Sequence, residues 1–251
     1  MGCGSSQPSN EVELQPRPLK VSAPQGGLQM IPAPQRDLTG RPIRHQYYDL
    51  RREDLRQALQ VVAEFLIRNH SQVTLVAVGG AVNTILLRTR DTTHDVDFFS
   101  SDLSHSDGAL LQEAARVAQT QSTIPLGGDW LNNSTTLYMG RALQVELRDL
   151  AIQQNDIVFQ SPGLTVLAAP WGYAFCTKVD RMTKRNARPY DCTDAAVYLN
   201  RFIATQNSGR PVNIRVIQAR AAHFGTSAPI EQLQSVEMEY QRLYHSHGLE
   251  F

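Results

Sequence analysis

Two short motifs in the first half of the chain contain residue types that bind metal ions and phosphate. Asp95 and Asp97 are separated by one residue, so on a strand both carboxylates point to the same face. Neighbouring carboxylates repel each other, and oxygen ligands of this kind suit Mg²⁺ when it is bound together with substrate phosphates. Gly79 and Gly80 follow an apolar stretch and precede a helical pattern, where close backbone approach and free N–H groups favour anions. The combination predicts a site for a cation and a phosphate.

The strands and helices that must position these motifs are indicated by the spacing of apolar residues. Val73–Val78 is a β-branched apolar run that ends at the two glycines, which predicts a buried strand, and Asp95–Phe99 resembles a second strand. Apolar residues recur at helical spacing from 49 to 69. Helices are also expected over 81–87 and from Ser106 to 119.

Two more strand-like segments, Thr135–Met139 and Leu143–Asp149, follow a loop rich in Gly and Asn. In the second segment apolar and polar residues alternate, which is the pattern of a half-buried strand. A last short strand is expected over Ile157–Phe159. These strands would complete a small mixed sheet.

Beyond residue 165 the patterns become helical, with prolines at expected first turns and glycines after expected last turns. The layout predicts an α+β fold, in which a small mixed sheet with flanking helices is followed by a helical C-terminal region. The expected units are a proline-rich tail over 1–45, a core over 46–165 and the helical region over 166–251. The helices expected in the last unit cover 170–185, 189–203, 213–224 and 229–247.

The order of the motifs resembles the signature of the nucleotidyltransferase superfamily, which has the polymerase-beta-like fold. That signature is a hydrophobic residue with Gly-Gly or Gly-Ser, followed further along by Asp-x-Asp, here Val78-Gly79-Gly80 and Asp95-Val96-Asp97. The chain is closer still to the nucleotidyltransferases of the abortive-infection and toxin type. Lys178, Arg181 and Asp194 on the C-terminal helices match positions of that group. Arg90 and Thr93 look like the basic and hydroxyl positions that the superfamily often has before the aspartates.

The resemblance implies a Mg²⁺- or Mn²⁺-dependent transfer of a nucleoside monophosphate from a nucleoside triphosphate, such as ATP, to a hydroxyl group. Asp95 and Asp97 would hold the cation against the triphosphate and would be catalytic. The superfamily often has a third carboxylate on a later strand. Glu146, on the polar side of the segment expected as a strand, is the first candidate for this metal ligand, and Asp149 is the second.

The resemblance also assigns the groups that contact the substrates. Gly79 and Gly80 would bind phosphates through backbone N–H groups, and Lys178 and Arg181 would do so through their charges. Asp194 would orient or deprotonate the acceptor hydroxyl. The acceptor, whether protein, RNA or small molecule, is not indicated by the sequence.

Simpler structural interpretations compete with these assignments. The aspartate pair can be a solvated strand end, Glu146 the exposed face of an edge strand, and the basic residues from Lys178 to Arg188 a solvated helix end. Ala81 stands where toxin-type members commonly have Ser or Thr. One alternative function is therefore a catalytically degenerate, membrane-anchored nucleotide-binding or scaffold protein. Another is an RNA-modifying enzyme that uses the basic helix as a phosphate groove.

The N-terminus and the composition indicate where the protein acts. Gly2 followed by Ser6 fits the pattern for myristoylation, and the adjacent Cys3 is a candidate for palmitoylation. The 24 basic and 24 acidic residues balance, which excludes nucleic-acid binding by bulk electrostatics. Three scattered cysteines exclude a disulfide scaffold, and no apolar run reaches the roughly 18 residues of a transmembrane helix. We expect a cytoplasmic protein held peripherally on membranes by N-terminal acylation.

Overall fold

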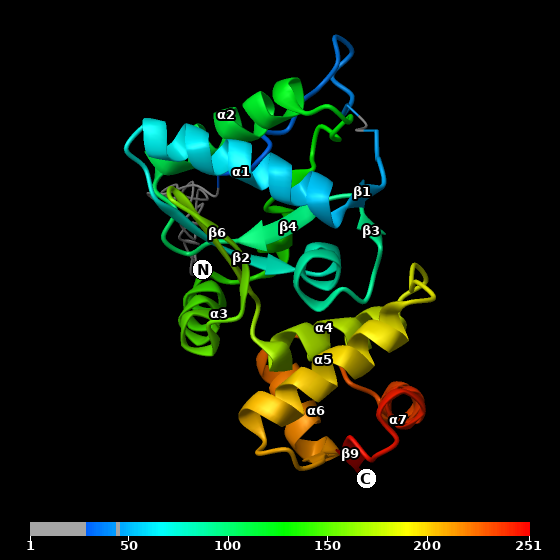
Figure 1. The fold of residues 1–251 in the computed structure, drawn as a ribbon. Helices are drawn as coiled ribbons and strands as arrows, with labels where there is room; N and C mark the ends of the chain where they lie inside the picture. The colour runs from blue at the N-terminus through cyan, green and yellow to red at the C-terminus, as the bar shows by residue number, and fades with distance from the viewer. Residues whose placement is uncertain (1–28, 44–45) are drawn as a thin grey trace, which may run out of the picture.

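A mixed five-stranded sheet forms the centre of the computed structural model, which describes residues 29–43 and 46–251 (Figure 1). The strand order is β5-β4-β2-β7-β6. Helices α1 and α2 cover one side of this sheet, and α3 lies on the other side. The bounds are β2 (Val73–Val78), β4 (Val96–Phe99), β5 (Leu131–Asn132), β6 (Ile157–Ser161), β7 (Leu164–Ala168), α1 (Arg52–Arg68), α2 (His105–Gln121) and α3 (Arg141–Gln154).

The register of the sheet brings the two sequence motifs together. Strand β2 runs parallel to β7 and antiparallel to β4, with Val78 opposite Asp97. Because Val78 directly precedes the two glycines, the aspartate strand begins beside the glycine turn. A short π-helical turn, η1 (Val82–Leu87), follows the glycines, and a two-stranded ribbon of β1 (Leu50–Arg51) and β3 (Thr92–Thr93) leads into β4.

The helical C-terminal region packs below the sheet and contains α4 to α7 (Figure 1). This arrangement confirms the predicted α+β class, a mixed sheet with flanking helices followed by helices. In the described residues no helix has both the length and the apolar character needed to cross a membrane. The elements are α4 (Trp171–Met182), α5 (Asp191–Gln206), β8 (Val212–Asn213), α6 (Ile214–His223), α7 (Ile230–Tyr244) and β9 (Leu249–Glu250).

Two segments that were expected to be strands are helical. Residues Ser134–Tyr138 form the 3₁₀ helix η2, and the segment 143–149 lies inside α3. The alternation that suggested a strand is too short to compete with the buried stripe of Gln144, Leu147 and Ala151, whose spacing is helical. Val145, which a half-buried strand would bury, is 41% exposed. The expectation of a strand over 143–149 is therefore wrong.

Part of the segment expected as a tail packs on the core. The side chain of Ile31 is 1% exposed, and its backbone N–H donates to Asn133 Oδ1 at 2.8 Å. Asn133 in turn donates from Nδ2 to the carbonyl oxygen of Gln29 at 2.8 Å. A single apolar residue is held here because Asn133 satisfies the backbone groups beside it. Gly2 and Cys3 lie outside the described residues.

Truncation of Ile31 measures how firmly this segment is attached. Ile31→Ala should lower the free energy of unfolding by about 2–4 kcal/mol, because it removes buried methyl groups and leaves a cavity. Leu38→Ala is the matched control: Leu38 lies in the same segment but is 108% exposed, so its truncation should change the free energy by less than about 0.5 kcal/mol. Urea unfolding of both variants provides the measurement. Equal effects would contradict the packing of Ile31.

Candidate functional site

A cleft of about 970 Å³ lies between the carboxyl end of β2 and the helices α4 and α5. This volume is at the upper end of the range of about 300–1,000 Å³ that is typical of small-molecule sites. The sheet side contributes the glycine turn, the β3 region and the two aspartates of the motif. The helical side contributes basic and aromatic residues of α4, α5 and the loop between them, including Lys178, Arg181, Arg188, Tyr190 and Tyr198.

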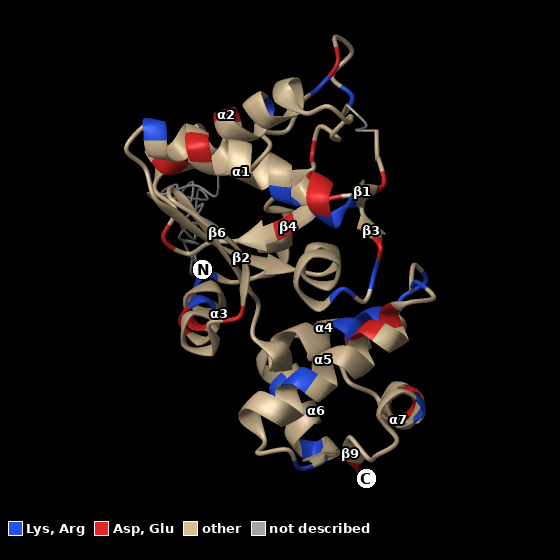
Figure 2. Cartoon of the chain, in the orientation of Figure 1, with Lys and Arg blue, Asp and Glu red and all other residues tan. Residues whose placement is uncertain are grey.

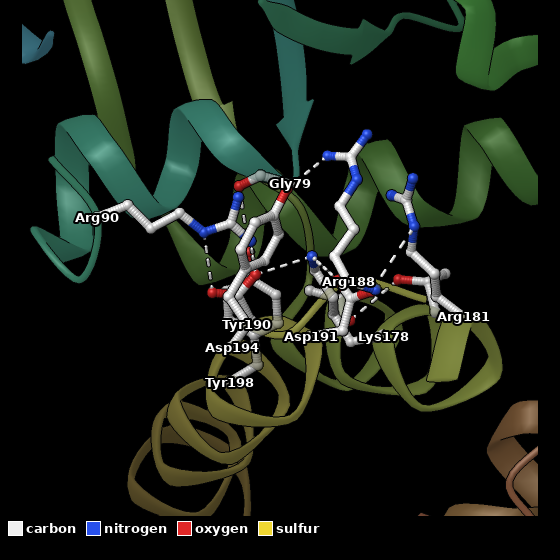
Figure 3. Close-up of polar contacts among 11 residues, drawn as sticks. Gly79, Arg90, Lys178, Arg181, Arg188, Tyr190, Asp191, Asp194 and Tyr198 are labelled. Atoms are coloured by element: carbon white, nitrogen blue, oxygen red, sulfur yellow. Dashed lines mark hydrogen bonds and ion pairs between the residues drawn. The ribbon is translucent and has the colours of Figure 1, made fainter. Parts of the chain in front are cut away.

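The glycine turn leaves its backbone open to the cleft. Gly79 has a φ of +69°, in the left-handed region that glycine adopts without a steric cost. Its carbonyl oxygen accepts a hydrogen bond from the Tyr198 hydroxyl at 3.2 Å, so α5 holds the turn from the opposite side (Figure 3). A Cβ at Gly80 would collide with the side chain of Thr93. Glycine is therefore required at both positions for different reasons.

Asp95 and Asp97 both line the cleft, in surroundings that disfavour the charged form of each carboxylate. Burial, together with the charges of Asp97 and Asp129, raises the pKa of Asp95 to about 7. Burial also raises the pKa of Asp97, although a hydrogen bond from Asn132 and the charges of Arg181 and Arg188 oppose this. The protein places two carboxylates where full ionisation of both is costly without a compensating positive charge.

The donor set fits a divalent cation that is shared with a substrate. Asp95, directly before β4, and Asp97, within β4, supply oxygen ligands to a cleft large enough for a nucleoside triphosphate. Within residues 29–43 and 46–251, no three His, Cys, Asp or Glu residues come together as a ligand set. Mg²⁺ is usually bound by one or two carboxylates, with water and substrate phosphates at the other positions. The residues fit this mode and do not form a cage made only of protein groups.

The two candidates for a third carboxylate lie elsewhere. Glu146 is on α3, and its Oε atoms are 2.9 Å from Nε2 of His223. Asp149, also on α3, lies 3.3 Å from Nη1 of Arg148. Neither residue lines the cleft. The expectation that Glu146 completes the metal site is wrong, because the segment that was expected to be a strand is a helix on another face.

Basic and acidic residues meet where α4 and α5 lie side by side (Figure 2). There a buried network of ion pairs forms beside the cleft and involves two of the predicted site residues (Figure 3). Lys178 Nζ lies 2.8 Å from Asp191 Oδ1 and 2.8 Å from Asp194 Oδ2. Arg90 donates from Nε to Asp194 Oδ1 at 3.1 Å, and its guanidinium carbon lies 3.6 Å from the centroid of the Tyr190 ring. The structure thus brings Lys178 and Asp194 together, but it pairs them with each other. Asp194 is 2% exposed and does not line the cleft.

Among the residues that the structure describes, Arg181 and Arg188 are the cations of the helical side that remain available to a ligand. The closest carboxylate oxygen to Arg181 is that of Asp191, at 3.8 Å, and Arg188 donates from Nη1 to the Tyr190 hydroxyl at 2.7 Å. Both charges act on Asp97 across the cleft. Arg181 was among the predicted phosphate ligands. The sequence predicts Arg188 only as part of a basic segment, because nothing in the neighbouring residues distinguishes it from Lys184 or Arg185.

The comparisons with known proteins place the cleft, except for its lining residue Tyr47, inside one family domain. Residues 49–247 match the model of a family described as "Domain of unknown function (DUF7582)". The matched range contains both motifs, the ion-pair network and both available arginines. No curated protein and no solved structure matches the chain.

Neutralising one aspartate should show two separate effects of the charge pair: its destabilisation of the protein without a cation, and its binding of the cation. Without divalent cations, Asp95→Asn should raise the melting temperature by a few degrees, because it removes charge repulsion in a partly buried site. Mg²⁺ with a non-hydrolysable nucleotide should then stabilise the wild type and leave the variant unchanged. Thermal shift assays with Glu146→Gln as control, the same chemical change on α3, provide the measurement. An equal response of both variants would contradict the assignment.

Proposed function

The chain belongs to the DUF7582 family, whose description names no activity, and we propose from the cleft itself that the protein is a Mg²⁺- or Mn²⁺-dependent nucleotidyltransferase. The observation that carries the proposal is the pairing of β2 with β4, which sets Asp97 opposite Val78 and beside the open glycine turn. The resemblance of both motifs to the nucleotidyltransferase superfamily supports the same activity.

Each group on the sheet side has a defined task in this proposal. Asp95 and Asp97 hold the cation, which when bound neutralises charge on the triphosphate and on the leaving pyrophosphate. The turn at Gly79 and Gly80 presents backbone N–H groups to the phosphates. On the opposite wall Arg181 and Arg188 bind the pyrophosphate, in the role that the sequence assigned to Lys178 and Arg181.

The reaction is a displacement at the α-phosphorus of the nucleoside triphosphate. An acceptor oxygen forms a bond to this phosphorus, the bond to the bridging oxygen breaks, and pyrophosphate leaves with the electron pair. The acceptor hydroxyl loses its proton to solvent. Asp194, which the sequence assigned to this proton, positions Arg90 and Lys178 instead, because its carboxylate is buried between them. Proteins, RNA and small molecules are the classes of acceptor to be tested.

One observation favours a second candidate function. The carboxylate expected to activate the acceptor, Asp194, is committed to two buried cations. A protein that binds the nucleotide and the cation without turning them over would need only Asp95, Asp97, the glycine turn and the arginines. Such a protein would act as a membrane-anchored nucleotide-binding or scaffold module.

Transfer of label from a triphosphate tests the proposed activity. With nucleoside triphosphates labelled at the α-phosphate, Mg²⁺ and a cell extract as the source of acceptors, the wild type should label a product. Asp95→Ala with Asp97→Ala should lower labelling at least about 100-fold, and Arg181→Gln with Arg188→Gln about 10- to 100-fold. Arg185→Gln, in the same loop but outside the cleft, should keep wild-type activity.

The outcomes of this experiment separate the two candidate functions. If no triphosphate gives labelling but calorimetry detects binding of Mg²⁺ and ATP, the protein is the nucleotide-binding module and not the enzyme. Absence of both labelling and binding would overturn both. Equal labelling by the wild type and the double aspartate variant would remove the aspartates from the mechanism.

We also propose that Gly2 carries a myristoyl chain and Cys3 a palmitoyl chain, so that the protein is held on membranes. A single myristoyl chain binds membranes only weakly, so the second chain is needed for stable attachment. In cell fractionation, Gly2→Ala should move the protein from the membrane to the supernatant. Ser5→Ala, which leaves the acylation pattern intact, should stay on the membrane. An unchanged distribution of Gly2→Ala would contradict the anchor.

A further inference from the structure

The strand next to the aspartate pair carries an amide where a third carboxylate would complete the metal site. Strand β5 runs parallel to β4, with Asn132 in register with Asp97. Neighbouring strands lie about 5 Å apart, and residues in register project from the same face of the sheet. Asn132 is therefore the nearest side chain that β5 offers to the aspartates. Its side chain is buried, with 4% exposure.

The orientation of the Asn132 amide is fixed by its hydrogen bonds. Its Oδ1 accepts from the backbone N–H of Ser134 at 3.0 Å, and its Nδ2 donates to the carbonyl oxygen of Asp129 at 3.2 Å. The same side chain lies close enough to Asp97 to lower the pKa of its carboxyl group by hydrogen bonding. A flipped amide would turn its NH₂ group towards the Ser134 N–H and its oxygen towards a carboxylate, so both contacts would be lost. The group that faces Asp97 is a donor, which cannot bind a cation.

The other acidic groups near the pair do not replace the missing ligand. Asp129 acts on Asp95 and Asp97 through its charge, but it forms no three-residue ligand set with them in the described residues. Asp194 is paired with Arg90 and Lys178. Asp49 and Asp91 also line the cleft, but in the described residues they form no three-residue ligand set with the pair. Asp95 and Asp97 therefore remain as ligands, enough for one cation that is shared with the triphosphate.

We infer that Asn132 restricts this site to a single divalent cation by occupying, as a hydrogen-bond donor, the position from which a third carboxylate would bind a second one. The inference rests on the proposed function, since it counts cations in the nucleotide-bound cleft. It has a chemical consequence: the cation of the triphosphate is present, but no second cation is held at the acceptor oxygen. Deprotonation of the acceptor is then not assisted by a metal, in contrast to two-metal transfer sites.

Counting bound Mn²⁺ tests the inference without measuring activity. The full chain is saturated with the non-hydrolysable analogue α,β-methylene-ATP, and free Mn²⁺ is followed by electron paramagnetic resonance during a titration. The wild type should bind one Mn²⁺ per chain, and Asn132→Asp should bind two, because the new carboxylate adds the missing ligand. Asp129→Asn is the control: it removes a nearby charge from outside the ligand set and should still bind one.

Each result of the titration has a defined meaning. Two Mn²⁺ per wild-type chain would overturn the inference and leave the proposed function standing. No Mn²⁺ and no analogue bound by the wild type would overturn the proposed function itself. A single Mn²⁺ bound by a folded Asn132→Asp variant, with folding checked by its melting curve, would show that Asn132 does not determine the number of bound cations. If Asn132→Asp does not fold, the wild-type count still decides between one cation and two.

Discussion

The repulsion between Asp95 and Asp97 is the interaction around which the cleft is organised. Asp95 directly precedes β4 and Asp97 lies within it, and burial raises the pKa of both. Several neighbouring groups counteract this excess of negative charge. Asn132 on the adjacent strand and Arg181 and Arg188 on the helical side lower the pKa of Asp97. A site that is incomplete until a cation enters is the arrangement expected of a metal–nucleotide site.

The ion-pair network of Arg90, Lys178, Asp191 and Asp194 keeps the two walls of the cleft in place. Arg90 comes from the sheet side and the other three residues from α4 and α5, so the network joins the two regions. Buried ion pairs contribute little net stability on average, because desolvation offsets their attraction. Breaking one partner is costly, however, since it leaves a buried charge alone. Its effect here is positional: it fixes α5, from which Tyr198 holds the carbonyl group of Gly79.

The parts of the site that the sequence predicted are those encoded by residues close together in the chain. The glycine turn and the aspartate pair each occupy a few consecutive positions, and their residue types limit what they can do. The α+β class followed in the same way from apolar spacing. The prediction that Glu146 is a metal ligand was wrong because the seven alternating residues around it resemble a strand, whereas the helical stripe of α3 extends over a longer stretch. A short period-two pattern does not outweigh a longer helical one.

The remaining parts depend on contacts between residues far apart in the sequence. The pairing of Asp194 with Arg90 joins positions 104 residues apart, and the contact of Tyr198 with Gly79 joins positions 119 residues apart. Asn132 becomes relevant only through the register of β5 with β4. No local pattern distinguishes these residues from other polar ones. The sequence therefore predicted the two motifs that meet in the cleft, and the tertiary fold determined which charged side chains around them are already paired.

The most direct test of this account is the coupling between cation and nucleotide. Isothermal titration calorimetry of the wild-type chain would measure the affinity for α,β-methylene-ATP in EDTA and in saturating Mg²⁺. If the aspartate pair and the triphosphate share one cation, Mg²⁺ should tighten nucleotide binding by about tenfold or more, and the nucleotide should tighten Mg²⁺ binding by the same factor. Nucleotide binding of equal strength in EDTA and in Mg²⁺ would contradict the account.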